Sequence, residues 1–193
     1  MTKKLALLGL ALAGLALNGC VWSVHPLYTE QTIVFEPALV GVWATPDGEK
    51  TAIVAAREDK SYEITYWDKD MSDGASMKYR ARLVRLGGYL FLDVQPDKKA
   101  VEGLMGVKPV WYLLPTHSFY RVQLNGEELT VSLVDDELVT RSATALAHEE
   151  IREKDGENGY LLTASPEELQ TALAPHATDD SIYAKLGDFR RLK

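Results

Sequence analysis

The chain has 193 residues, a net charge of −7 and a single cysteine. This length is enough for one domain with a sizeable hydrophobic core. The acidic balance argues against nucleic acid as a partner and against electrostatic attachment to anionic lipid headgroups.

Residues 1–19 have the pattern of a secretory signal peptide. The basic pair Lys3 and Lys4 precedes an apolar run over residues 5–17, and a small residue stands before Cys20. A membrane-spanning helix needs about 20 apolar residues, so this run is too short for a transmembrane anchor. A plain secreted protein, in which Cys20 is incidental, and a buried N-terminal helix are the alternatives.

The sequence Leu17-Asn18-Gly19-Cys20 resembles the lipobox of bacterial lipoproteins. The resemblance implies cleavage before Cys20, lipidation of its thiol and acylation of the new amino end with a fatty acid such as palmitate. It places the protein in the bacterial cell envelope, held by membrane lipid. Because Val21 and not Asp follows the cysteine, the outer membrane, on its periplasmic side, is expected in a Gram-negative source. Acylated Cys20 leaves no thiol for a disulfide, a nucleophile or a metal site.

Residues 20–39 form the expected acylated tether. Their apolar density predicts that the tether either packs onto the domain or rests at the lipid interface, and residues 32–36 suggest a short edge strand. The opening Val-Trp-Ser-Val-His-Pro-Leu-Tyr after Cys20 is similar to that of a group of bacterial lipoproteins of unknown function. The apolar residues of the tether include Trp22, Tyr28, Ile33, Val34 and Phe35.

Residues 40–193 are expected to form one β-rich globular domain. Alternating apolar and polar residues predict strands, and Gly87-Gly88 and Asn125-Gly126 predict tight hairpin turns. The predicted strands cover residues 42–44, 50–57, 61–68, 78–86, 89–94, 110–114, 118–124, 128–134, 148–154 and 160–164.

Three segments near the C-terminus have helical patterns. Residues 135–146 carry an apolar stripe, and residues 165–174 begin with the capping box formed by Ser165 and Glu168. Residues 181–186 predict a short helical turn. The chain is therefore expected to be mainly β, an antiparallel meander sheet or barrel of about eight strands with one or two C-terminal helices.

Gly41-Val42-Trp43 resembles the Gly-x-Trp motif of lipocalins. The resemblance implies a lipocalin-like eight-stranded barrel around an apolar ligand, with Trp43 at its closed end, so Trp43 is a candidate ligand-binding residue. Arg80 and Arg82 share one face of a predicted strand. They either pair with acidic strands or contact a small anion or carboxylate inside or at the rim of the barrel.

Motifs for catalysis and metal binding are absent from the sequence. No Gly-x-Ser-x-Gly or His-Glu-x-x-His occurs, and the strand neighbours His117 and Ser118 should face opposite ways. The acidic stretch from Asp68 to Gly74 departs from the calcium-loop pattern. We therefore expect no enzyme activity, no catalytic residue, no metal ligand and no cofactor.

Three functions remain open. A non-catalytic envelope lipoprotein that binds an apolar or amphipathic ligand would need an interior cavity of about 300 Å³ or more. A structural or assembly accessory that meets another envelope protein would have a filled core and an exposed apolar patch. An envelope hydrolase, the least favoured, would need titratable groups that converge in one cleft.

Overall fold

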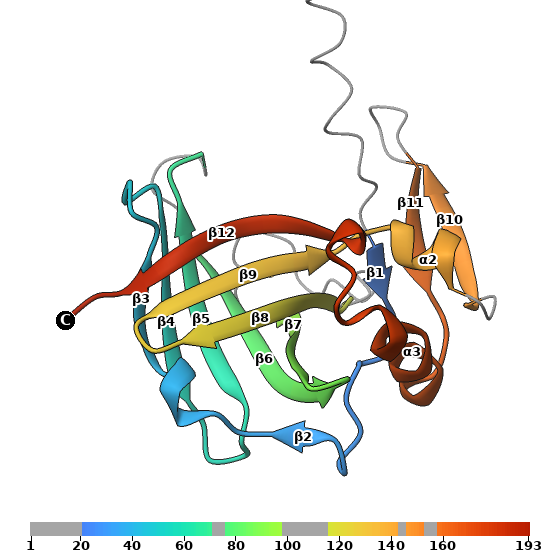
Figure 1. The fold of residues 1–193 in the computed structure, drawn as a ribbon, viewed down its shortest axis with the longest axis horizontal. Coiled ribbons are helices and arrows are strands. Elements are labelled where there is room, and N and C mark those ends of the chain that lie inside the picture. The colour runs from blue at the N-terminus through green and yellow to red at the C-terminus, as the bar shows by residue number, and fades with distance from the viewer. Residues whose placement is uncertain (1–20, 71–75, 98–115, 143–145, 153–157) are drawn as a thin grey trace, which may run out of the picture.

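The structure is a computed structural model and describes residues 21–70, 76–97, 116–142, 146–152 and 158–193. In this part of the chain, eight antiparallel strands form a closed barrel (Figure 1). Neighbouring strands pair in chain order, and the last strand pairs with both β9 and β3, which closes the ring. The barrel strands are β3 (Gly41–Ala44), β4 (Lys50–Ala56), β5 (Tyr62–Asp68), β6 (Ser76–Leu86), β7 (Tyr89–Pro96), β8 (Ser118–Asn125), β9 (Glu128–Val134) and β12 (Tyr183–Arg191). The predicted mainly β fold is confirmed.

The closing strand β12 differs from the prediction. A short 3-10 helix, η4 (Asp180–Ile182), stands at the start of the predicted helical turn over residues 181–186, and the chain then runs extended. A β-bulge between Lys185 and Gly187 shifts the register against β9. Because the bulge breaks the two-residue alternation, β12 lacks the pattern by which the other barrel strands were predicted.

A second, smaller sheet contains the first strand of the tether. β1 (Val21–Ser23) pairs in parallel with β11 (Asn158–Leu162), and β11 pairs antiparallel with β10 (His148–Arg152). The predicted final hairpin therefore exists but lies outside the barrel. The strand predicted over residues 110–114 falls outside the described residues.

The rest of the tether packs onto the domain. Leu27 is fully buried, and β2 (Ile33–Val34) adds to the edge of β6, as predicted for residues 32–36. The 3-10 helix η1 (Pro37–Leu39) then leads into β3. The sequence left open whether the tether packs onto the domain or rests at the lipid interface, and in the structure residues 21–39 pack onto the domain.

The helices lie between β9 and β12 in the chain. α3 (Pro166–Leu173) has the predicted capping box, because Ser165 N–H donates to Glu168 Oε2 at 2.8 Å and Glu168 N–H donates to Ser165 Oγ at 3.3 Å. α2 (Glu137–Arg141) is shorter than predicted, because Ser142 is extended and ends it. A 3-10 helix, η3 (Ala174–His176), follows α3 directly. Within the described residues no helix has the length and apolarity to cross a bilayer.

Two hydrophobic clusters hold the molecule together. One fills much of the barrel interior, and the other lies between the outer surface of the barrel and a side layer made of β1, β10, β11, α2 and α3 (Figure 1). The interior cluster contains Trp43, Tyr62, Leu83 and Phe189. The outer cluster joins Phe91 and Phe119 of the barrel to Leu27, Leu162, Leu169, Leu173 and Ile182.

Candidate functional site

A cavity of about 150 Å³ lies inside the barrel. All eight barrel strands contribute to its wall through inward-facing side chains, which are mostly apolar. Five aromatic side chains contribute to its wall. The lining consists of Trp43, Ala52, Val54, Ile64, Tyr66, Tyr79, Leu92, Val94, Tyr120, Leu129, Val131, Leu186 and Phe189.

Trp43 lies at the end of the barrel next to η1. Its Nε1–H donates to the Leu39 carbonyl at 2.9 Å, and the side chain is fully buried. The Arg191 guanidinium stacks 4.3 Å from the centre of the Trp43 ring and donates to the Val40 carbonyl at 2.6 Å. These contacts tie β12 to η1, and they hold Trp43 in the wall of the cavity, where the sequence predicted a ligand-binding residue.

The opposite end of the barrel has a polar mouth, formed by Lys50, Tyr66 and Asp68. Lys50 and Asp68 are the next inward-facing residues beyond Ala52 and Tyr66 on paired strands. The Tyr66 hydroxyl donates to Asp68 Oδ2 at 3.0 Å, and Lys50 Nζ lies 3.9 Å from Asp68 and donates to the Leu186 carbonyl at 3.0 Å. A hydrogen bond from Asp70 N–H, helped by the Tyr66 hydroxyl and Lys50, lowers the pKa of Asp68.

Two tyrosines bring hydroxyl groups to the cavity as neutral donors. Burial, followed by the hydrogen bond to Asp68, raises the pKa of Tyr66, and burial raises the pKa of Tyr79. The Tyr79 hydroxyl has no hydrogen bond to any residue that the structure describes, and it is not cut off from solvent. Tyr79 is thus a lining residue whose hydroxyl has no partner among the described residues.

Arg80 and Arg82 lie on the outer face of β6 and take no part in the cavity. Arg82 forms an ion pair with Asp59 at 2.9 Å and lies over the Tyr28 ring at 5.2 Å, and Arg80 is exposed. Tyr79 and Ala81, which alternate with them, face the interior. Arg82 thus has an ion pair, with an acid of the connection between β4 and β5 and not of a strand, and neither arginine lies inside the barrel. Cys20, the predicted lipidation site, lies outside the described residues.

A buried polar pair on the outer surface of the barrel was not predicted from the sequence. His117 Nδ1 lies 2.6 Å from Asp93 Oδ1, and Asp93 Oδ2 accepts the Leu27 N–H at 2.6 Å. The exposed fractions of Asp93 and His117 are 2% and 8%. Asp93 interrupts the apolar run of β7, and a lone acid in such a run is the signal that it has a buried partner.

The Asp93–His117 pair has the form of a base and its orienting acid, so its surroundings decide whether it can catalyse. His117 Nε2 lies 3.3 Å from the Gln95 amide nitrogen, and no described hydroxyl is hydrogen-bonded to it. A hydrolase of this type needs a nucleophile at that nitrogen. In the described residues the pair therefore joins the tether to β7 and has no nucleophile to activate.

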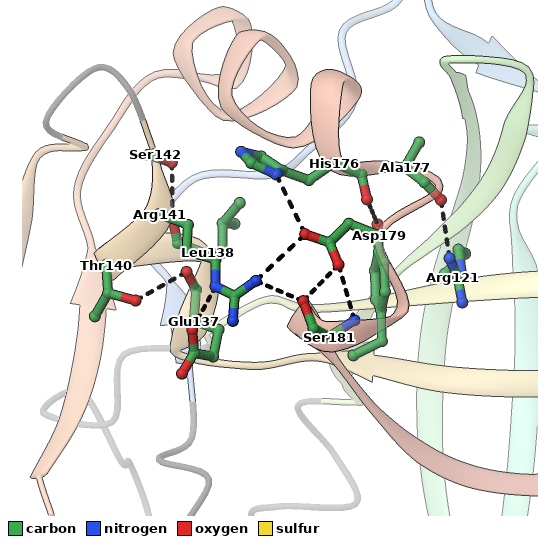
Figure 2. Close-up of polar contacts among 11 residues, drawn as sticks. Arg121, Glu137, Leu138, Thr140, Arg141, Ser142, His176, Ala177, Asp179 and Ser181 are labelled. Atoms are coloured by element: carbon green, nitrogen blue, oxygen red, sulfur yellow. Dashed lines mark hydrogen bonds and ion pairs between the residues drawn. The ribbon is translucent and has the colours of Figure 1, made fainter.

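A polar cluster on the side layer joins α2 to η4 (Figure 2). Arg141 donates to Glu137 at 2.6 Å and to Ser181 Oγ at 2.6 Å, and it lies 3.5 Å from Asp179. Hydrogen bonds from Ser181 lower the pKa of Asp179. His176 is 3.9 Å from Asp179. The described residues contain no group of three or more His, Cys, Asp or Glu that could hold a metal ion.

A buried arginine connects the barrel to the same region. Arg121 of β8 donates to the Ala177 carbonyl at 2.9 Å (Figure 2). It also pairs with Asp180 and lies 4.0 Å from the centre of the Tyr183 ring. The side chain is 6% exposed, whereas that of Asp180 is 86% exposed. The guanidinium is thus held mainly by a carbonyl and an aromatic ring.

Comparison of the chain with protein-family models, curated proteins and solved structures finds no match.

Proposed function

We propose that this protein is a bacterial envelope lipoprotein, anchored through acylated Cys20, whose barrel binds one small apolar group of an amphipathic ligand without catalysis. The observation that carries the ligand proposal is the cavity, which combines an apolar wall with an accessible hydroxyl at Tyr79. The lipobox supports the anchor.

The size of the cavity limits the ligand. At about 150 Å³, the cavity does not reach the roughly 300 Å³ expected from the sequence for a ligand-binding barrel, so binding of a complete drug-sized ligand inside it is dropped. An apolar cavity of about 150 Å³ engineered into another protein admits benzene. A whole lipid is therefore excluded from the closed barrel, and the guest is one ring or a short chain segment.

The polar groups around the cavity favour a guest with one neutral hydrogen-bonding group. Lys50 and Asp68 offset each other's charge at the mouth, so neither of these two groups is left unpaired to attract a charged ligand. The Tyr79 hydroxyl can donate to or accept from a phenol, an alcohol or an amide. Burying such a group without a partner would be costly, so the hydroxyl contributes selectivity as well as affinity.

Ligand binding is tested on the detergent-extracted full chain with p-cresol and benzene as probes. A ligand at 100 times its Kd raises the free energy of unfolding by about 2.7 kcal/mol, which urea titration detects. Tyr79→Phe should weaken p-cresol but not benzene. Ala52→Leu, which fills the cavity, should abolish both shifts, and Ala55→Leu, on the exposed face of the same strand, should leave them intact. Equal shifts in the two leucine variants would contradict the proposal.

The anchor is tested separately by growth of the expressing bacterium with labelled fatty acid. Label should enter the protein, and Cys20→Ser should abolish both labelling and cleavage of residues 1–19. Persistence of the label in Cys20→Ser would exclude Cys20 as the site.

A second candidate, an accessory that binds another envelope protein, is favoured by one surface. Ile53 and Leu192 are 49% and 53% exposed, and Val42 lies between them on the outer face of the barrel. Exposed apolar side chains that adjoin each other mark interaction surfaces. If this surface is used, Ile53→Glu should remove a crosslinked envelope partner while p-cresol binding persists.

A further inference from the structure

We infer that the outer face of the small sheet, formed by Trp22, Leu161 and Ile151, rests on the surface of the bilayer that holds the acyl chains. This inference rests on the proposed anchoring at Cys20. It adds that the domain has a fixed side toward the membrane.

The first step is that β1 leaves almost no free tether. Val21 is the residue after Cys20, and adjacent Cα atoms are about 3.8 Å apart. Val21 and Ser23 are 4% and 0% exposed, and Ser23 exchanges two backbone hydrogen bonds with His117, at 2.9 and 2.8 Å. The acylated residue is therefore attached directly to a strand that is part of the fold.

The second step is the side of the sheet on which apolar groups remain partly exposed. Val21, Ser23 and Leu162 face the barrel and are buried. Trp22 and Leu161 are opposite each other on the other side and are half-buried. Ile151, on the same side opposite Gly159, is 37% exposed.

The third step identifies the occupant as lipid. Chains of an acylated Cys20 must enter the bilayer within one residue of β1, so the bilayer surface is the partner nearest to this face. Tryptophan is enriched at the membrane–water interface, where its ring is apolar and its N–H remains hydrated.

The charge distribution sets the tilt of the sheet. Glu149 is level with Trp22 and Leu161 but lies on β10, the edge farthest from the anchor. Glu149 and Glu150 are exposed. The β1 edge therefore lies deeper in the lipid than the β10 edge, where Ile151 still reaches the bilayer surface while Glu149 stays at the water side. The contact does not rely on anionic lipid, because the chain has a net charge of −7.

The test uses the full acylated chain in phosphatidylcholine vesicles. Because acylation consumes the only native thiol, Ile151→Cys provides a unique site for a nitroxide label. Oxygen concentrates in lipid and a nickel chelate in water, so the ratio of their effects on the label reports depth. We expect a ratio at Ile151→Cys several-fold above that at the control Ile53→Cys, a more exposed position on the outside of β4.

Leu161→Glu added to Ile151→Cys should return the label to water while the protein still sediments with vesicles. The mass of the mature N-terminus is measured on the same samples. An acylated Cys20 with equal ratios at the two labelled positions would overturn this inference alone. An unmodified Cys20 thiol would overturn the anchoring and this inference together.

Discussion

At the scale of single residues, the strongest constraints come from buried polar groups with defined partners. Asp93 uses one carboxyl oxygen for the Leu27 N–H and the other for His117 Nδ1. A buried group of this kind costs free energy when a partner is lost, because water cannot replace it. Asp93 thereby fixes the tether to the barrel at a defined point.

Asp93→Asn should lower the free energy of unfolding by about 1–3 kcal/mol, because the amide has one acceptor for two donors. Urea unfolding measures the loss. Asp188→Asn is the control, since Asp188 is exposed and bonds Thr130 and Lys185 at the surface, and it should change stability by less than about 1 kcal/mol. Equal losses of unfolding free energy in the two variants would show that the buried Asp93 contacts stabilise the fold no more than the exposed Asp188 contacts do.

Two features of position 41 favour glycine: its backbone conformation and the close approach of Arg191. Its φ is +149°, and a Cβ there would overlap the Arg191 guanidinium. Gly41→Ala should displace Arg191 from the Trp43 ring and cost about 1–3 kcal/mol, with a shift of the Trp43 indole N–H resonance. Gly48→Ala is the control. Its φ is +73° and the space around the Cβ is open, so the only cost in stability is backbone strain. An unchanged Trp43 resonance in Gly41→Ala would contradict the overlap.

Residue-level predictions from sequence depended on whether the signal was local. The Ser165 cap involves neighbours in the chain, and the structure has it where it was expected. Gly41 and Trp43 are likewise local and lie in the first barrel strand. Asp93 and His117 are 24 positions apart, and only the fold brings them together. For the arginines of β6, alternation gave the shared face of Arg80 and Arg82 but could not tell the inside of the barrel from the outside.

At the scale of elements, regular period decided which strands could be predicted. β4 to β9 were found from apolar and polar alternation, as in β5, or from the hairpin turns that flank them, whereas the bulge of β12 hides the strand that closes the barrel. β1 was included in the tether, since three residues give too short a pattern to establish a strand. The parallel pairing of β1 with β11 depends on residues almost 140 positions away and has no local signal.

The capping box should contribute measurably to α3. Ser165→Ala should cost about 1 kcal/mol in the free energy of unfolding, whereas Thr171→Ala, exposed within the same helix, should cost nothing because alanine favours helix. The hydrogen bond from Ser165 N–H lowers the pKa of Glu168 in the folded state. The stabilisation from the ionised Glu168 carboxylate is therefore complete above the pKa of Glu168 in the unfolded state, and it is lost as the pH falls through the pKa of Glu168 in the folded state. The stability difference between wild type and Glu168→Gln should shrink on acidification, and a constant difference would contradict this.

At the scale of the whole molecule, the barrel and the side layer share one outer cluster but have separate tasks. The interior cluster surrounds the cavity, while the outer cluster attaches the tether and α3 to the barrel wall. The proposed anchor and the proposed ligand site are thus on different parts of one domain. Any link between them must pass through contacts such as Arg121.

Arg121→Ala should loosen the side layer more than the barrel. The substitution removes the hydrogen bond to Ala177 and the stacking on Tyr183, and about 1–3 kcal/mol of stability should be lost. Asp180→Ala should cost less than about 1 kcal/mol, because the Asp180 carboxylate is 86% exposed and leaves the other Arg121 contacts in place.

Amide hydrogen exchange can show which elements become less stable in Arg121→Ala. Amides of α3 and β11 should lose protection in this variant, while those of β4 and β5, on the far side of the barrel, should keep it. Barrel and side layer would then be separable units, and p-cresol binding should survive the substitution. A uniform loss of protection over all strands would instead mean that the two clusters unfold together, and that the side layer is required for the cavity.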